Sequence, residues 1–195
     1  MENIIPRWEW RTFQKDLSIA GENIKKFPQG KTRESSEVYI LSKESNNNTK
    51  IRDMLMDIKT LKNINDDKLE QWMPIMKAGF PIKKETVIEV FKAFNLPEPV
   101  LSKEAYCYEE YIGNIIKNND SLLAVDVFKI RTGYTINDCI VEIAEITLNN
   151  NIKVMTAAVE LEDPAKVIST VRELKLDTFE NINYIKALKT NLKFN

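Results

Sequence analysis

The sequence contains no histidine, and this absence removes several classes of enzyme at once. Ser-His and Cys-His nucleophilic catalysis both need an imidazole as general base, and histidine is a principal ligand of catalytic zinc. The side chain that most often titrates near neutral pH is missing as well. Any catalysis would therefore depend on carboxylates, lysine, arginine, tyrosine or a metal-bound water.

Cysteine is almost as scarce, since Cys107 and Cys139 are the two in the sequence and lie far apart. Two separated thiols favour reduced, packed side chains over a disulfide framework, and they provide no ligand set for a soft metal. Carboxylates prefer hard cations. The sequence therefore predicts that any metal cofactor would be Mg²⁺ or Mn²⁺.

Long apolar runs are also missing, so no segment is expected to span a membrane, and the first residues lack the pattern of a signal peptide. The 28 Lys and Arg residues nearly balance the 29 Asp and Glu residues, which argues against a DNA-binding protein. A length of 195 residues fits one domain. We therefore expect a single cytoplasmic domain, 1–195, and the sequence leaves its oligomeric state open, a homodimer included.

Alternating strands are what the sequence does contain. The stretch 4–14 alternates Arg7, Glu9 and Arg11 with Trp8 and Trp10, and successive side chains of a strand point to opposite faces. Alternation and β-branched residues predict further strands at 35–43, 69–80 (with Pro74 at an edge or bulge), 121–135, 138–148 and 151–162, and a hairpin at 49–61 that turns at Asp53-Met54.

Apolar residues at helical spacing predict helices at 83–95, 103–119, 163–176 and 181–192. The helix at 163–176 is well marked, because Asp163 fits its N-cap and Pro164 its first turn. Lys31 and Arg33 are expected in a flexible loop. The pattern as a whole predicts an α+β fold with an antiparallel sheet of about eight strands. Trp8, Trp10 and Trp72 are expected to pack beneath the helices.

Charged side chains gather on one face of several predicted strands. The simplest explanation is a sheet with one solvated face. However, the charges are grouped by sign, and the apolar faces supply the surface that amphipathic helices must cover. If helices cover those faces, the charges line a concave surface that suits a polyphosphate bound through a divalent cation. The pattern is carried by the cations Arg7, Arg11, Lys50, Arg52, Lys59, Lys129 and Arg131 and the carboxylates Glu9, Glu160 and Glu162.

The order of these segments resembles the CYTH superfamily, the triphosphate tunnel metalloenzymes, over nearly the whole chain. The resemblance rests on the first strand, on "KIRDMLMDIK", "FKIR" and "AAVELED" before a helix, and on the closing "NINYIKALK". It implies a closed eight-stranded antiparallel barrel with helices packed outside. It also implies that the lumen binds a triphosphate and that acidic residues hold Mg²⁺ or Mn²⁺.

The first strand departs from the family pattern. The family reads Glu-x-Glu-x-Lys, whereas this sequence reads Arg7-x-Glu9-x-Arg11, so Arg7 replaces the first carboxylate. We expect this change to weaken metal binding by charge repulsion and to favour direct binding of an anion. Carried over by position, the resemblance implies the metal ligands Glu9, Glu142, Glu160 and Glu162 and the phosphate contacts Arg7, Arg11, Lys50, Arg52, Lys59, Lys129 and Arg131.

The resemblance implies a metal-dependent hydrolase that acts on inorganic, nucleoside or thiamine triphosphate. One alternative is a class IV-type adenylate cyclase. Another is a non-catalytic module that binds polyphosphate through a degenerate metal site, and Arg7 favours this alternative. In each case the expected partner is a small triphosphate or polyphosphate.

Overall fold

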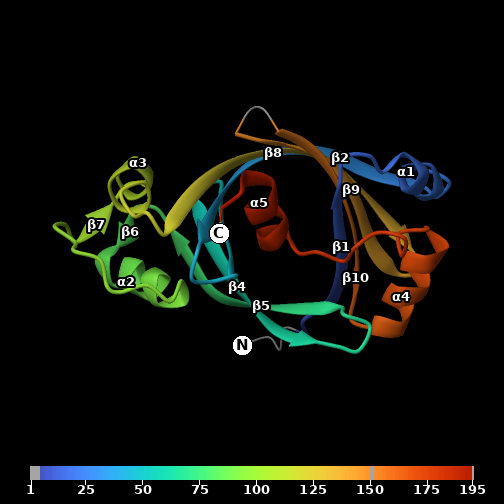
Figure 1. Ribbon diagram of the computed structural model, residues 1–195, viewed down its shortest axis with the longest axis horizontal. Coiled ribbons are helices and arrows are strands. Elements are labelled where there is room, and N and C mark those ends of the chain that lie inside the picture. Colours follow the sequence, from blue (N-terminus) through green and yellow to red (C-terminus); the bar gives the residue numbers. More distant parts are fainter. Residues whose placement is uncertain (1–4, 150–151, 195) are drawn as a thin grey trace.

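The computed structural model describes residues 5–149 and 152–194 and shows a closed antiparallel barrel (Figure 1). The order of strands around the barrel is β1-β10-β9-β8-β2-β3-β4-β5. The predicted α+β class and eight-stranded barrel are therefore confirmed. The strands are β1 (Trp8–Gln14), β2 (Gln29–Ser42), β3 (Asn48–Arg52), β4 (Leu55–Ile64), β5 (Glu70–Gly79), β8 (Leu122–Ile136), β9 (Cys139–Leu148) and β10 (Ile152–Leu161).

The remaining elements flank the barrel on opposite sides (Figure 1). On one side lie α2 (Lys84–Ala93), α3 (Tyr108–Glu110), the π-helix η1 (Tyr111–Ile116) and the small sheet of β6 (Ile82–Lys83) and β7 (Ala105–Tyr106). On the other side lie α1 (Ser18–Ile24), which the sequence did not predict, and α4 (Pro164–Glu173). Within the described ranges, no helix combines the length and apolarity needed to cross a bilayer.

The outward faces of the strands form the surface on which these helices pack. Trp10 is 4% exposed and packs in one cluster with Val167 and Val171 of α4. Ile40 and Phe91 belong to a second cluster, between the barrel and α2. The apolar faces of the strands are thus the outer faces, and the charged faces point into the lumen.

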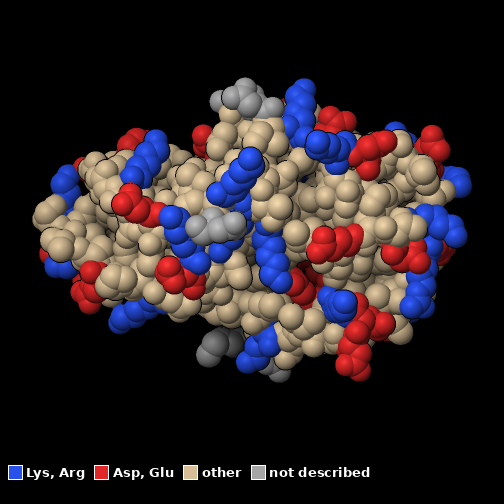
Figure 2. Space-filling model, viewed as in Figure 1, with Lys and Arg blue, Asp and Glu red and all other residues tan. Residues whose placement is uncertain are grey.

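The last helix, α5 (Tyr184–Leu192), has a different position, because it lies inside the ring of strands in Figure 1. Its residues Tyr184, Ile185 and Leu188 pack against inward-facing side chains that include Tyr39 and Val127. An amphipathic helix therefore fills part of the lumen. On the face seen in Figure 1, Lys and Arg side chains gather over the centre of the molecule (Figure 2).

The segment before α5 completes the barrel wall. β1 pairs with β5 at two positions only, Trp8 with Gln71 and Glu9 with Glu70. Beyond them, the Ile182 amide donates to the Arg11 carbonyl (2.7 Å), and the Arg11 amide donates to Asn181 Oδ1 (2.9 Å). This pairing along β1 fixes the point at which α5 enters the lumen.

The hairpin β3–β4 has the predicted turn and register. Asp53 and Met54 both have positive φ (51° and 57°), as a two-residue type I′ turn requires, and Lys50 lies opposite Asp57. β2, in contrast, begins at Gln29 and not near residue 35. The prediction of a flexible loop around Lys31 and Arg33 is wrong, because this segment pairs with the end of β8.

The buried position of Trp10 beneath α4 can be tested by truncation. Trp10→Ala removes a fully packed aromatic ring, so we expect the free energy of unfolding to fall by about 3–5 kcal/mol. Urea denaturation measures this change. Trp8→Ala, on the same face but only half-buried, is the control and should cost less. Equal, small losses for both variants would contradict the packing of Trp10 beneath α4.

Candidate functional site

Arg11 lies at the centre of a chain of ion pairs in the lumen. Its Nε donates to Glu9 Oε1, and its Nη1 donates to Thr156 Oγ1 (3.2 Å) and lies 3.5 Å from Glu142 Oε1. The second oxygen of Glu142 accepts from Arg131 Nη1 (3.2 Å). Burial opposes the charge of Arg11, but the carboxylates of Glu9 and Glu142 outweigh it and raise its pKa. Four strands, β1, β8, β9 and β10, thus meet in one network.

A second cluster surrounds Glu37, which is 3% exposed. Lys129 Nζ and Arg52 Nη1 lie 3.6 and 3.5 Å from its two carboxylate oxygens, and the Tyr39 hydroxyl donates to Oε2 (3.1 Å). Burial disfavours the ionised carboxylate, but Lys129 and Lys50 outweigh this cost and lower the pKa of Glu37. Glu37 was not among the predicted site residues, although alternation within the predicted strand 35–43 places it on the face of Tyr39.

Tyr184, the first residue of α5, connects the two clusters. Arg11 Cζ lies 5.4 Å and Lys129 Nζ 4.8 Å from the centroid of its ring, within the range of cation–π attraction. The Tyr39 ring stacks on the same residue at 4.7 Å. The helix in the lumen therefore contributes to holding two of the predicted phosphate contacts in place.

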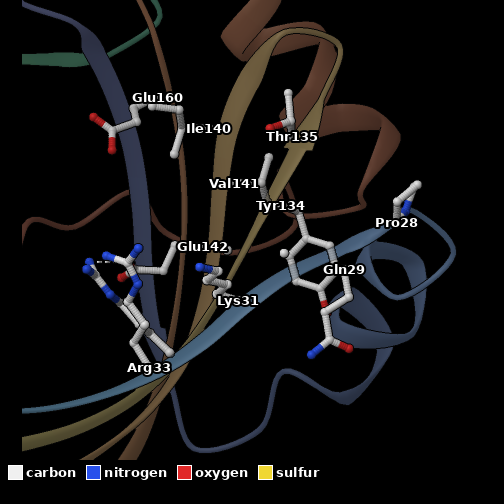
Figure 3. A pocket seen from close by; sticks show the side chains of 13 residues that line it. Pro28, Gln29, Lys31, Arg33, Tyr134, Thr135, Ile140, Val141, Glu142 and Glu160 are labelled. Atoms are coloured by element: carbon white, nitrogen blue, oxygen red, sulfur yellow. Dashed lines mark hydrogen bonds and ion pairs between the residues drawn. The ribbon is translucent and has the colours of Figure 1, made fainter.

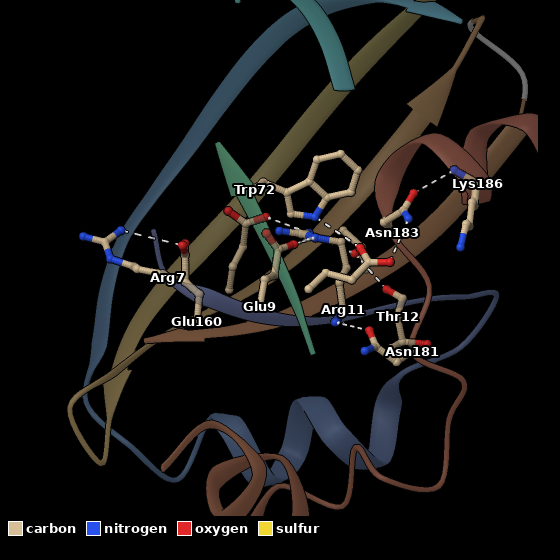
Figure 4. Close-up of polar contacts among 12 residues, drawn as sticks. Arg7, Glu9, Arg11, Thr12, Trp72, Glu160, Asn181, Asn183 and Lys186 are labelled. Carbon is tan, nitrogen blue, oxygen red and sulfur yellow. Dashed lines mark hydrogen bonds and ion pairs between the residues drawn. The ribbon is translucent and has the colours of Figure 1, made fainter. Parts of the chain in front are cut away.

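Three glutamates form a row across the neighbouring strands β10, β1 and β5, where β1 pairs with β5. Glu9 lies opposite Glu160 of β10 and opposite Glu70 of β5. Arg7 Nη1 lies 3.6 Å from Glu160 Oε2, and Asn183, the N-cap of α5, donates to Glu70 Oε1 (3.1 Å) (Figure 4). Burial and the neighbouring Glu9 carboxylate raise the pKa of Glu160. Glu70 was not among the predicted site residues.

Trp72 lies on the inner side of the barrel, and the prediction that it packs beneath a helix is wrong. Its indole Nε1 donates to Glu70 Oε2 (3.1 Å). The cause is a register shift between Ile58 and Lys59, where Lys59 pairs with Pro74. A β-bulge adds one residue to a strand and reverses the faces of the residues beyond it.

The carboxylate row has the right chemistry for a hard cation. Mg²⁺ usually takes one or two protein carboxylates and completes its shell with water and phosphate oxygens. Glu9 and Glu160 could serve as such a pair, although Arg11 and Arg7 now occupy them. In residues 5–149 and 152–194, no three acidic side chains converge closely enough to form a metal site by themselves. These residues therefore fit a metal that arrives with a phosphate ligand.

The other predicted residues are distributed over the inner wall, with one exception. Lys50 and Lys59 share the inward face of the β3–β4 hairpin, and burial lowers the pKa of Lys50. Arg33 lies opposite Arg131 at the mouth of the barrel, where a pocket of about 570 Å³ opens (Figure 3). Glu162 is exposed beyond the end of β10, and within 5–149 and 152–194 it forms no ion pair.

Comparison with known proteins supports the fold. No protein-family model and no curated protein matches the sequence. A conserved hypothetical protein from Pyrococcus furiosus has a similar structure, with a TM-score of 0.50 and 13% identity over 92% of this chain and 98% of that chain. A protein from Bacillus halodurans described as a candidate adenylate cyclase has a TM-score of 0.50 and 11% identity over 93% of this chain and 95% of its own. At these identities the likeness shows the fold alone, which agrees with the barrel that the CYTH resemblance implies.

Removal of the Glu37 carboxylate should destabilise the protein in a pH-dependent way. Glu37→Gln leaves Lys129 buried without its ion-pair partner, so we expect a loss of about 3 kcal/mol or more in the free energy of unfolding at pH 7. The folded-state pKa of Glu37 lies below its ordinary value of 4.5. Its ionised form therefore stabilises the fold above that pH, and the contribution is lost as the pH falls through the lowered pKa.

The difference in the free energy of unfolding between wild type and Glu37→Gln should consequently become smaller as the pH falls. Urea unfolding of both proteins at a series of pH values between neutral and acidic measures it. A difference that stays constant over that range would show that Glu37 is not ionised in the lumen.

Proposed function

We propose that the barrel binds a triphosphate in its lumen and hydrolyses a phosphoanhydride bond with Mg²⁺ or Mn²⁺. The observation that carries this proposal is the arrangement of charge on the inner wall. Five strands, β1, β2, β3, β4 and β8, direct cations inwards, and the three carboxylates Glu9, Glu70 and Glu160 lie in a row beside them. A cationic enclosure next to carboxylates suits an anion that carries a hard metal ion. This function is also the one that the CYTH resemblance implies.

Binding would exchange one set of ion pairs for another. Arg11 and Arg131 now share Glu142, each through its Nη1, and phosphate oxygens can take the place of that carboxylate. Arg33 and Lys50, for which no carboxylate of the described residues lies within 4.0 Å, add positive charge that is not already neutralised at close range. The lumen is therefore suited to a ligand with several negative charges.

The carboxylate row supplies the other half of the proposed chemistry. Once Arg11 turns towards phosphate, Glu9 is released, and Glu9 and Glu160 would hold the metal. A bound Mg²⁺ or Mn²⁺ supplies charge neutralisation at the phosphoryl group and a water of lowered pKa. Arg11, Arg131 and Lys129 would hold the phosphates and stabilise the negative charge that develops on them during transfer.

Two alternative functions use the same lumen. The ion pair between Arg7 and Glu160 occupies a proposed metal ligand and favours a module that binds polyphosphate without turnover. The Bacillus halodurans protein described as a candidate adenylate cyclase has a similar fold, and a cyclase would join the ribose 3′-hydroxyl to the α-phosphate and release pyrophosphate. The products distinguish these functions.

An assay of products tests the proposal directly. We expect the protein to release orthophosphate from ATP, thiamine triphosphate or inorganic triphosphate with Mg²⁺ or Mn²⁺, and to lose this activity in EDTA. Glu160→Gln should lower the rate by about tenfold or more, because it removes a charged metal ligand. Glu145→Gln, on the exposed outer face of β9, is the matched control and should leave the rate unchanged. Tight binding in EDTA without turnover would favour the binding module, and pyrophosphate with a cyclic nucleotide would favour the cyclase.

Arg7 offers a test by gain of function. Arg7→Glu restores the carboxylate of the family pattern and removes a cation from the metal-binding row. We expect the Mn²⁺ concentration that gives half-maximal activity to fall by roughly tenfold, which corresponds to about 1.4 kcal/mol. The Arg7 side chain is 50% exposed, so the fold should tolerate the change.

Arg7→Gln is the matched control for that experiment, because it removes the ion pair with Glu160 without adding a carboxylate. Its effect should be smaller than that of Arg7→Glu. If both substitutions leave the dependence on Mn²⁺ unchanged, Arg7 does not lie at the metal-binding position that the resemblance assigns to it.

A further inference from the structure

Trp72 is an unusual side chain for the lumen, because its large apolar ring faces charged groups. None of the three apolar clusters formed by the described residues includes it. Its indole N–H can only donate a hydrogen bond, and it donates to Glu70 Oε2 (3.1 Å) (Figure 4). Packing in the apolar core therefore does not account for the position of Trp72, and the contact with Glu70 is the specific interaction that it makes.

The other oxygen of Glu70 is held as well. Asn183 Nδ2 donates to Glu70 Oε1 (3.1 Å), and Asn183 is 6% exposed. The N-cap of α5 sets the orientation of this amide, because its Oδ1 accepts from the Lys186 backbone N–H (3.0 Å). Trp72 and Asn183 thus fix the two oxygens of one carboxylate from two different segments of the chain.

Both of these donors are neutral, which distinguishes Glu70 from the other two glutamates of the row. Glu9 pairs with Arg11, and Glu160 Oε2 lies 3.6 Å from Arg7 Nη1. In the part of the chain that the structure describes, no lysine or arginine nitrogen lies within 4.0 Å of the Glu70 carboxylate. Glu70 is therefore the carboxylate of the row that has no cation at close range.

This row of glutamates is costly unless a further cation completes it. Glu9 lies directly opposite both Glu70 and Glu160, and like charges at opposite positions of a sheet repel each other. The hydrogen bonds from Trp72 and Asn183 orient Glu70 without neutralising it, and each of its oxygens keeps a further lone pair. In metal sites, the ligating carboxylates are themselves held by such hydrogen bonds from surrounding residues.

We propose that Trp72 is a positioning residue of the metal site. Together with Asn183, it holds Glu70 in an orientation in which this carboxylate receives the metal ion of a metal–triphosphate complex, without first displacing Arg7 or Arg11. This inference rests on the proposed function, because the metal ion enters with the triphosphate. It adds Glu70 to the proposed ligands and gives a role to the ring that the bulge in β5 turns into the lumen.

The test separates the metal-dependent part of binding from the rest. The probe is diimidotriphosphate, an analogue of inorganic triphosphate whose bridging nitrogens resist hydrolysis. Isothermal titration measures its affinity in EDTA and again with Mn²⁺, and the ratio of the two affinities is the gain that the metal provides. Trp72→Phe keeps an aromatic ring and removes the N–H that reaches Glu70. Trp8→Phe is the matched control, because Trp8 packs on the outer face of β1.

We expect a gain of at least about tenfold in wild type and in Trp8→Phe. Trp72→Phe should lose most of this gain, because removal of a residue that orients a metal ligand commonly costs about 10–100-fold in metal affinity. Its affinity in EDTA should stay within about twofold of wild type, because the cations that hold phosphate are unchanged. Glu70→Gln should lose the gain to at least the same extent, and adding Trp72→Phe to it should have no further effect.

Fluorescence gives a second readout, which a general loosening of the fold would not reproduce. Mn²⁺ is paramagnetic and quenches the emission of a tryptophan that lies close to it, whereas Mg²⁺ does not. When Mn²⁺ replaces Mg²⁺ at saturating diimidotriphosphate, the emission of wild type and of Trp8→Phe should fall, and that of Trp72→Phe should fall much less.

The proposal is overturned if Trp72→Phe keeps the whole gain, if it weakens binding equally in EDTA and in Mn²⁺, or if it lowers the gain further in the Glu70→Gln protein. An equal loss of emission in all three proteins would overturn it too. In these cases the proposed function stands if Glu160→Gln still lowers the gain. If wild type binds the analogue no more tightly with Mn²⁺ than in EDTA, the metal-dependent function itself fails, and this inference fails with it.

Discussion

A closed barrel gives each strand one face that points inwards, and an ionised side chain on that face must find a counter-charge or water. In this protein α2 and α4 pack on the outer faces, where their apolar side chains cover Ile40 and Trp10. The paired charges of Arg11, Glu142 and Glu37 consequently lie in the lumen, whereas Glu145 lies on an exposed part of the outer face of β9. The pairing of Arg11 with Glu9 and Glu142, and of Glu37 with Lys129, follows from this constraint.

Under the proposed function, the same ion pairs would be exchanged for contacts with an anion. A cavity lined by unpaired cations would be costly to fold, because like charges repel and each loses hydration. Here the carboxylates offset that cost in the free protein, and Arg11, Arg52 and Arg131 each have a carboxylate partner that phosphate oxygens can replace. Because α5 places Tyr184 against Arg11 and Lys129, the C-terminal helix is part of this arrangement and not only a cover for the barrel.

The parts of the site that the sequence could predict are those that depend on local alternation. Trp10 faces outwards and Glu9 lies beside Glu160, because side chains alternate between the two faces of β1 and β10 without a bulge. Lys50 faces Asp57 because a two-residue turn fixes the register of a hairpin. For such segments, local sequence decides which face each side chain takes.

The parts that could not be predicted depend on contacts between distant segments or on a bulge that interrupts the alternation of a strand. Trp72 lies in the lumen because a bulge beside Pro74 reverses the alternation of β5. Alternation places Glu37 on one face with Tyr39, but its cationic partner Lys129 comes from a distant strand. Glu70 lies opposite Glu9 and accepts from Asn183, and both residues are far from it in the sequence. An amphipathic pattern predicts α5 but does not say which apolar surface the helix covers. In this protein that surface lies inside the barrel.

Arg7 decides how a metal could enter the site. With Arg7 and Arg11 beside Glu9, Glu70 and Glu160, the row of three carboxylates retains one net negative charge, which attracts a free divalent cation only weakly. Under the proposed function, a triphosphate that already carries its metal ion would present anionic oxygens to the arginines and the cation to the carboxylates, so both sets of charges would be satisfied together. A carboxylate at position 7 would remove this coupling, because the row could then hold a cation in the absence of ligand. Arg7 is therefore compatible with the proposal that metal and phosphate bind together.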